Sequence, residues 1–335
     1  MISTYPGVVL GIESSCDETS LALLEGTRVR GLHIASQVDM HAKWGGVVPE
    51  AAARAHVEAL LPGLAECLEQ AKLSLAEVRA IAVTNRPGLI GALSVGVSAA
   101  KALSFGLAVP LIGIHHLEGH ILSPYLTSPD FPFPHLCLIA SGGHTELVRV
   151  NAPGKQTLLG QTLDDAAGEA FDKCARLLGL GYPGGRAVEE CARQGDPRRY
   201  RLPRGVPNQP FNFSFSGLKT AVMRTVQTEG DRLNPADLAA SLQAAVVDAL
   251  VTKAVRACEQ ESLSALTLVG GVAANTPLRE TLRREAERAG VVFATPEPIY
   301  CTDNAAMIAL AGSVRLAGGE VSDFTLDVFP NADLP

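Results

Sequence analysis

Residues 114–123 read IHHLEGHILS, which places two histidines four residues apart directly after an apolar segment typical of a strand. On a helix, positions i and i+4 lie on one face about one turn apart. His116 and His120 can therefore offer both imidazoles to one ion, while His115 points elsewhere. The spacing predicts a metal pair, and two ordinary surface or core histidines at helical spacing are the alternative.

The position of Glu118 in this stretch shows whether the histidine pair matches the H-E-x-x-H motif of zinc proteases. In those enzymes the glutamate directly follows the first histidine, whereas Glu118 comes two residues after His116. At roughly 100° per residue it lies about 200° around the helix from that histidine. Glu118 is therefore poorly placed as a general base, which disfavours a metalloprotease.

Length and composition narrow the class of protein. A chain of 335 residues exceeds what one hydrophobic core usually supports, so we expect two lobes and a cleft. The net charge of -7 excludes coating of nucleic acid by bulk charge, but it allows a local basic patch. Seven cysteines without a C-x-x-C pair indicate reduced thiols in a cytosolic protein, and Cys16 is expected to be a packing thiol.

The N-terminus does not predict an export signal, and the apolar run at 88–114 does not predict a membrane span. The N-terminus lacks a basic region followed by a long apolar core. The apolar run at 88–114 contains Lys101 and is interrupted by Pro110. Because a charge near the bilayer centre costs about 3 kcal/mol, this run is interpreted as a buried helix followed by a strand.

The order of expected elements repeats along the chain. In the first half we expect strands at 8–12, 20–24, 29–34, 81–84 and 111–114, and helices at 47–71, with a local break at Pro62 and Gly63, and at 88–105. In the second half we expect strands at 136–140, 146–150, 157–161, 265–269 and 291–294, and helices at 166–180, 235–260, 277–289 and 304–317. Asp164 or Asp165 is expected to cap the helix at 166–180. The repeat predicts an α/β protein of two similar lobes around a nucleotide cleft.

The predicted boundaries follow from the proline-rich segment 125–134, which cannot be helix or central strand. Residues 1–134 form the expected first lobe, with 312–335 packing back on it. Residues 135–311 form the second lobe, with an insertion at about 182–234.

Polar glycine turns follow three of the expected strands. They are GIESSCDET at 11–19, SGGHTEL at 141–147 and GGVAAN at 270–275. Glycines there let the backbone approach a ligand closely, and a turn between a strand and a helix commonly holds a phosphate. Tight turns need glycine in any case, so each turn alone is weak evidence. Asp303 precedes the last helix, either as its N-cap or as an oxygen ligand completing a two-histidine, one-carboxylate site.

The densest basic run lies in the expected insertion. It comprises Arg193, Arg198, Arg199, Arg201 and Arg204, with Tyr200 among them. Such a run suits contacts with an RNA backbone, and a solvated insertion is the alternative.

Eight ordered motifs together resemble the TsaD family of bacterial tRNA N6-adenosine threonylcarbamoyltransferases, once named O-sialoglycoprotein endopeptidases. The motifs are GIESSCDETS at 11–20, HHLEGHILSP at 115–124, SGGHTEL at 141–147, DDAAGEAFDK at 164–173, YPGG at 182–185, FSFSGLKTA at 213–221, GGVAAN at 270–275 and TDNAAMIA at 302–309. The resemblance implies the fold of actin, sugar kinases and heat-shock ATPases (ASKHA), with two RNase H-like lobes. It also implies transfer of threonylcarbamoyl from threonylcarbamoyl-AMP to N6 of the adenosine 3′ to the anticodon, in tRNAs that read ANN codons.

The resemblance also assigns residues and partners. It implies one divalent metal per subunit, iron(II) or zinc, on His116, His120 and Asp303. It implies adenylate binding, with ATP and Mg²⁺ as an alternative nucleotide, by Ile139, Ala140, Ser141, Gly142, Gly143, Asp172, Gly185 and Asn275. No residue is identified as a general base.

The implied partners are tRNA, the paralogue TsaB, the ATPase TsaE and a separate synthase of the adenylate, in the cytoplasm and without a membrane. The apolar helix at 88–105 is the candidate TsaB contact, through Gly91 and Ser94. An ASKHA-fold kinase or an ATP-dependent scaffold is the rival interpretation of the same residues.

Overall fold

The computed structural model describes residues 2–334, which divide into two compact units. The first unit runs up to Phe131 and takes in Ala152–Lys155 and the chain from Pro296 onward. The second unit comprises Pro132–Asn151 and Gln156–Thr295. Residues 296–311 thus lie in the first unit, because the last helix packs on the first sheet. The expected boundary had assigned them to the second lobe.

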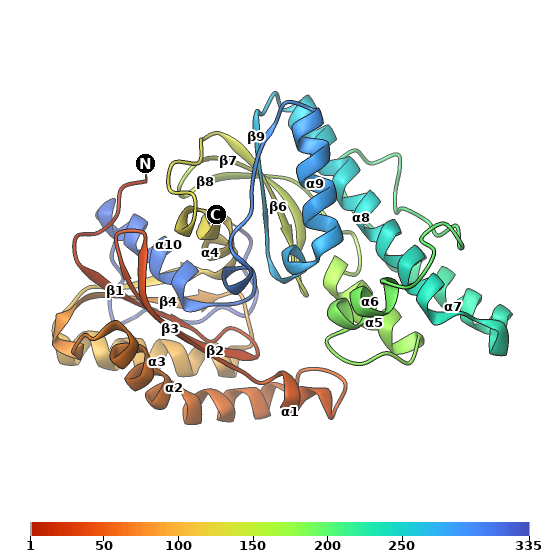
Figure 1. Ribbon diagram of the computed structural model, residues 1–335. Helices are drawn as coiled ribbons and strands as arrows, with labels where there is room; N and C mark the ends of the chain where they lie inside the picture. The colour runs from red at the N-terminus through yellow and green to blue at the C-terminus, as the bar shows by residue number, and fades with distance from the viewer. Residues whose placement is uncertain (1, 335) are drawn as a thin grey trace. The chain divides into compact units, whose positions relative to one another are not determined.

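The first unit contains a five-stranded mixed sheet in the order β3-β2-β1-β4-β5 (Figure 1). Its strands are β1 (Val8–Glu13), β2 (Glu18–Glu25), β3 (Arg28–Ser36), β4 (Val78–Arg86) and β5 (Leu111–His115). Its helices are α1 (Val38–Ala42), α2 (Pro49–Ala71), α3 (Ile90–Leu107), α4 (His116–Leu122) and α10 (Ala305–Ala317), with short 3₁₀ turns η1 (Leu75–Glu77), η2 (Ser123–Leu126) and η5 (Pro298–Tyr300). β1 pairs antiparallel with β2 and parallel with β4.

Helices cover both faces of this sheet, with α2 and α3 on one side and α10 with α4 on the other (Figure 1). Successive side chains of a strand point to opposite faces. Leu10 and Ile12 accordingly belong to the core formed with α2 and α3. Gly11 faces α10, where a Cβ would lie 2.2 Å from the carbonyl oxygen of Ala305. The glycine therefore lets the backbone of α10 lie directly on β1.

Helix α2 is continuous, so the expected break at Pro62 and Gly63 is wrong. Proline removes one helical hydrogen bond, that to the carbonyl of residue i−4. Both Pro62 and Glu58 are exposed, so water can solvate the carbonyl that this proline leaves free. Gly63 is buried instead, and a Cβ there would lie 2.7 Å from the His33 ring on β3.

The chain after α10 runs along the β4 and β5 side of the first sheet. The backbone N–H of Ser322 donates to the carbonyl of Leu111 at 2.7 Å, and that of Phe329 donates to the carbonyl of Asn85 at 3.0 Å. β5 ends the sheet, and a covered edge strand cannot pair with another chain.

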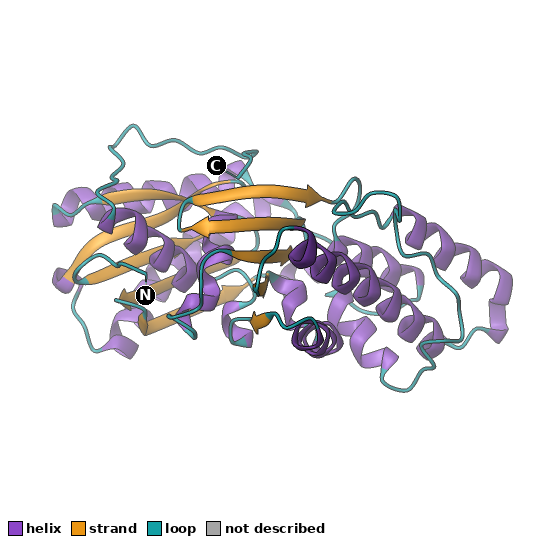
Figure 2. Cartoon of the chain, turned by 90° about the horizontal axis from the view of Figure 1, so that it is seen from above, coloured by secondary structure: helices purple, strands orange, loops and turns teal. Residues whose placement is uncertain are grey.

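The second unit repeats this topology in the order β10-β9-β6-β7-β8. Its strands are β6 (His135–Ala140), β7 (Thr145–Ala152), β8 (Lys155–Gln161), β9 (Ala265–Val269) and β10 (Val292–Ala294). Its helices are α5 (Ala167–Leu177), α6 (Gly184–Ala192), α7 (Ser216–Glu229), α8 (Pro235–Gln260) and α9 (Thr276–Arg288), with 3₁₀ turns η3 (Gly230–Arg232) and η4 (Gly271–Ala274). Figure 2 shows helices packed against strands in each unit. The predicted duplication of strand order is confirmed.

The expected cap of α5 is wrong. The N-cap of α5 is Ala166, which makes no side-chain capping bond. Asp164 instead caps a distant helix: its Oδ1 accepts from the backbone N–H groups of Phe215 at 2.7 Å and Ser216 at 3.2 Å, where α7 begins. Asp165 pairs with Lys173 at 2.6 Å.

Candidate metal and nucleotide sites

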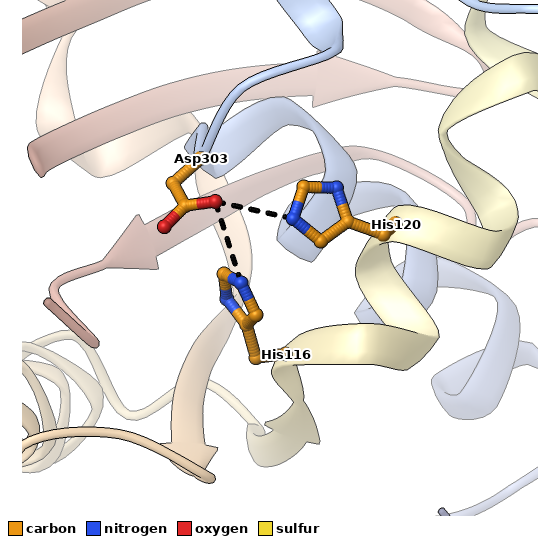
Figure 3. Close-up of side chains that lie close together, drawn as sticks. All are labelled: His116, His120 and Asp303. Atoms are coloured by element: carbon orange, nitrogen blue, oxygen red, sulfur yellow. Dashed lines mark hydrogen bonds and ion pairs between the residues drawn. The ribbon is translucent and has the colours of Figure 1, made fainter. Parts of the chain in front are cut away.

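Three side chains of the first unit converge on one point (Figure 3). The Nε2 atoms of His116 and His120 lie 3.4 and 3.1 Å from Oδ1 of Asp303. His120 is fully buried and His116 is 8% exposed. The ligand atoms all lie within 4.8 Å of one another, close enough to coordinate a single ion. Two imidazoles and one carboxylate are a common donor set for iron(II) and zinc, so these residues fit the ion that the sequence predicts.

Close packing between α4 and α10 brings these ligands together across 183 residues of sequence. A Cβ at Gly119 would lie 2.7 Å from the Ile308 side chain and 3.0 Å from that of Met307, so α4 needs its glycine to lie this near α10. Asn304 caps α10 by accepting from the backbone N–H of Met307, and its Nδ2 donates to the carbonyls of Tyr300 and Thr302. Asn304 thus fixes the turn that carries Asp303.

A fourth buried side chain, Glu13 at the end of β1, contacts His116, one of the three candidate metal ligands. Its Oε2 lies 3.1 Å from Nδ1 of His116 and accepts from Oγ1 of Thr84 at 2.5 Å. Its Oε1 accepts from the backbone N–H of Ser15 at 2.6 Å. Sequence reasoning missed Glu13, because nothing in the GIESSCDET turn indicates which of its polar side chains faces a histidine 103 residues later.

The electrostatics show an excess of negative charge around this point. Burial alone would lower the pKa of His116, but the carboxylates of Asp303 and Glu13 outweigh it and raise that pKa well above its ordinary value. Burial also opposes ionisation of Asp303, yet the two imidazoles hold its pKa well below the ordinary range. Burial, Asp303 and Asp17 together raise the pKa of Glu18 to about 10. A divalent cation would relieve this repulsion between carboxylates.

Glu118 is directed away from the three candidate metal ligands, as the spacing predicts. Its Oε2 accepts from Nη1 of Arg315 at 2.9 Å, and the side chain is 1% exposed. Burial raises the pKa of Glu118 despite this arginine. A carboxylate held in this ion pair cannot serve as the base of a metalloprotease at His116 and His120.

The residues predicted to bind the adenylate form a ring of contacts within the second unit. Ile139 and Ala140 are the buried end of β6, and the turn 141–143 follows them. The carbonyl of Ser141 accepts from the backbone N–H of Gly168 in α5, at 3.1 Å. A Cβ at Gly270 would lie 2.5 Å from the carbonyl oxygen of Ala140, so the turn after β9 also packs here.

Helices α5 and α6 close the ring. Asp172, on α5, accepts through Oδ1 from the backbone N–H of Gly184 at 2.7 Å, at the start of α6 beside Gly185. One turn further along α6, Glu189 accepts from Nδ2 of Asn275 at 3.1 Å. All eight predicted residues therefore belong to this one set of connected elements.

Two members of this ring escaped the sequence analysis. Glu189 and Gln243, on α6 and α8, both accept from Nδ2 of Asn275, at 3.1 and 3.0 Å. Oδ1 of Asn275 accepts from the backbone N–H of Leu278 and so caps α9. The sequence offers no local signal for this arrangement, because the three side chains come from helices far apart in the chain.

Comparison with known proteins places the chain in a family. A family model described as tRNA N6-adenosine threonylcarbamoyltransferase, TsaD, matches residues 28–310. The chain belongs to the TsaD family. A tRNA N6-adenosine threonylcarbamoyltransferase of Symbiobacterium thermophilum is 52% identical over 98% of this chain and 97% of its own length. One of Syntrophotalea carbinolica is 48% identical over 97% of this chain and 96% of its own.

Solved structures agree with the ASKHA fold of this TsaD family member. HypF of T. kodakarensis superposes with a TM-score of 0.64 at 14% identity, covering 94% of this chain and 48% of HypF. The activator of the 2-hydroxyisocaproyl-CoA dehydratase from Clostridium difficile, with bound ADPNP, superposes with a TM-score of 0.54 at 12% identity, covering 94% of this chain and all of the activator. At such identities the likeness concerns the fold alone.

Proposed function

We propose that this TsaD family member transfers threonylcarbamoyl from threonylcarbamoyl-AMP to N6 of the adenosine 3′ to the anticodon, in tRNAs that read ANN codons, and releases AMP. The convergence of His116, His120 and Asp303 carries this proposal, because a sugar kinase or an ATP-dependent scaffold of the same fold needs no paired histidines. An exocyclic adenine amine is a weak nucleophile, so the reaction requires an activated mixed anhydride as donor.

The three ligands are proposed to hold one iron(II) or zinc ion. A bound divalent ion would supply Lewis-acid polarisation of the threonylcarbamoyl carbonyl. Glu13 accepts from Nδ1 of His116, which leaves Nε2 as the nitrogen for coordination, and Asp303 supplies the anionic ligand. No described side chain is assigned the role of general base.

The adenylate is proposed to bind at the ring of contacts in the second unit, through Ile139, Ala140, the 141–143 turn, Asp172, Gly185 and Asn275. Within residues 2–334, no group accepts a hydrogen bond from the backbone N–H of Gly142 or Gly143, and both glycines are exposed. Their missing side chains leave open space on this turn. Such N–H groups are suited to a phosphate, whether that of the adenylate or that of ATP with Mg²⁺.

We further propose that the chain works in the cytoplasm with tRNA, TsaB, TsaE and a separate synthase that makes the donor. Helices α3 and α8 are both long and apolar enough to cross a membrane. Yet α8 is mostly buried in its own unit, as a core helix is, and α3 packs one face on β4 of the first sheet.

Helix α3 is the proposed TsaB contact, because only a third of it is buried and Ile90 is 60% exposed. Gly91 is unsuitable for testing this, since a Cβ there would lie 3.2 Å from that of Ala53 on α2. Ile90→Asp should abolish the heterodimer on a sizing column, with Val292→Asp, an equally exposed residue of β10, as the control. Unchanged elution of Ile90→Asp would remove α3 from the interface.

The experiment that tests the activity supplies the protein, TsaB and TsaE of a compatible bacterium, threonylcarbamoyl-AMP and unmodified tRNA. Mass spectrometry of the digested RNA then detects threonylcarbamoyladenosine. We expect product from wild type and none from His120→Ala. The control His33→Ala, which removes a histidine of β3 paired with Glu66, should retain activity.

A result without product from wild type, with a homologue active in the same mixture, would refute the transferase. The kinase or scaffold interpretation would then apply to the nucleotide site. Equal product from His120→Ala and wild type would instead refute the metal's part in the reaction.

A further inference from the structure

The segment after α6, residues 193–209, is fastened along α8 and is here called the strap (Figure 1). Its contacts with α8 advance along both segments in the same direction. The backbone N–H of Asp196 donates to Asp237 at 2.8 Å, and the backbone N–H of Tyr200 donates to Ser241 at 3.1 Å. Further along, Nη2 of Arg204 donates to Asp248 at 2.9 Å, and Nζ of Lys253 donates to the carbonyls of Val206 and Gln209. Successive anchors on α8 lie about one to two turns apart. The strap is therefore an ordered part of the second unit rather than a loose insertion.

The strap carries five arginines and one aspartate in a chain whose net charge is -7. Arg199 lies over the ring of Tyr200 and Arg204 pairs with Asp248. The guanidinium groups of Arg193, Arg198 and Arg201 are exposed and make no hydrogen bond or ion pair with any residue of 2–334. Because the anchors fix the backbone that carries these three cations and none of the three has an ion-pair partner, an incoming polyanion would gain favourable electrostatic energy.

A groove of about 300 Å³ lies between the strap and α9, above α8. Gly195 and Pro197 of the strap line one wall, Thr281 and Arg284 of α9 line the other, and Ala240 of α8 lies in the floor. An adjoining pocket includes Arg193. The groove thus has Arg284 on its α9 wall and Asp248, the partner of Arg204, on α8, while Arg193 of the strap lines the adjoining pocket.

We propose that the strap and the facing side of α9 bind the phosphate backbone of the tRNA substrate, an inference that rests on the proposed function. Arginine suits this role better than lysine, because its planar guanidinium contacts phosphate oxygens with two parallel hydrogen bonds. The half-exposed Tyr200 adds an aromatic ring beside the arginines, which suits an unpaired base. Bulk charge cannot supply RNA affinity in an acidic chain, so a local surface of this kind is required.

The test replaces Arg193, Arg198 and Arg201 together by glutamine and measures binding of an unmodified tRNA transcript by fluorescence anisotropy over a series of KCl concentrations. Each phosphate contact contributes about 0.7 to 0.9 to the slope of log K against log salt. We expect the slope to become shallower by about 2 to 3 and the Kd at low salt to rise at least about tenfold. The control replaces Arg28, Arg224 and Arg232, which are exposed, unpaired within the described residues and outside the strap, and should leave both quantities close to wild type.

Three results would overturn the inference. The first is an unchanged salt slope of tRNA binding in a strap variant that keeps the wild-type melting temperature. The second is an equal loss of tRNA affinity in the control variant. The third is competition for tRNA binding by polyglutamate that is as strong as competition by RNA at equal charge. If the triple variant does not fold, Arg198→Gln alone must lower the slope by about 0.7 to 0.9, and no change would refute the proposal. If the wild type forms product but the strap variant binds tRNA as the wild type does, this surface is refuted and the transferase activity is not. If the wild type forms no product, the transferase activity is refuted.

Discussion

Replacing Glu13 by glutamine should weaken metal binding although Glu13 is not a ligand. The carboxylate accepts three hydrogen bonds, from His116, Thr84 and Ser15, and it is fully buried. If the glutamine oxygen faces His116, its amide nitrogen opposes the backbone N–H of Ser15. If the amide nitrogen faces His116, the imidazole must carry its proton on Nε2, and Nε2 can then no longer coordinate.

The expected magnitude follows from this conflict and from the lost charge. Carboxylates that hold a metal-bound histidine typically account for a 10- to 100-fold difference in metal affinity. This corresponds to about 1 to 3 kcal/mol at 25 °C. The two histidines and Asp303 carry one negative charge between them, and Glu13 supplies the second that balances a divalent ion.

Calorimetric titration of metal-free protein with zinc measures the effect directly, without any assay of activity. Glu118→Gln is the matched control, since Glu118 is equally buried and lies on α4 but pairs with Arg315. That variant should lose stability and keep its zinc affinity. Zinc binding by Glu13→Gln within twofold of wild type, at an unchanged melting temperature, would refute the positioning role.

Three further predictions concern stability, each measured by urea unfolding. Burial holds the pKa of His135 at about 4, below the 6.5 of an unfolded histidine. Between these two values the unfolded state binds more protons than the folded state. The free energy of unfolding should therefore fall as pH drops from about 6.5 toward 4, by about 3 kcal/mol at most. His135→Phe should make this pH dependence shallower, and an unchanged profile would contradict it. Gly11→Ala should cost about 1 to 3 kcal/mol through its contact with Ala305, whereas Gly217→Ala, with open space around it, should cost nothing. Asp164→Ala should cost about 1 kcal/mol because it uncaps α7, and Asp165→Ala, which loses only an ion pair with Lys173, clearly less.

Local patterns in the sequence were enough to predict the strands, most helices and the duplicated strand order. Alternating or continuous apolar runs report burial of the strand that carries them, and turn residues mark their ends. The errors arose where a distant partner decides the outcome. Asp164 has the position of a cap for α5, but it bonds to the start of α7 some 50 residues later. Pro62 resembles a helix break, but the exposed side of α2 tolerates the lost bond.

The same distinction separates the predicted from the missed site residues. His116 and His120 lie one helical turn apart, so their spacing alone predicts that both can face one ion. Glu13 contacts His116 only because β1 and β5 both flank β4, and Glu189 contacts Asn275 only because α6 and α9 both pack beside α8. Contacts of this kind depend on topology, and no window of the sequence contains both partners.

The charges around the paired histidines favour a metal site over ordinary core histidines. A core histidine is usually neutral and needs one or two neutral hydrogen-bond partners. His116 lies instead between two buried carboxylates, Glu13 and Asp303, and no lysine or arginine among residues 2–334 forms an ion pair with either. Protonation of His116 balances one of the two buried carboxylates, and a divalent cation would balance both. Because the ion would bind the folded first unit and no comparable site exists in the unfolded chain, its binding energy adds to the stability of that unit, and β1, α4 and α10 should resist unfolding more strongly when it is bound.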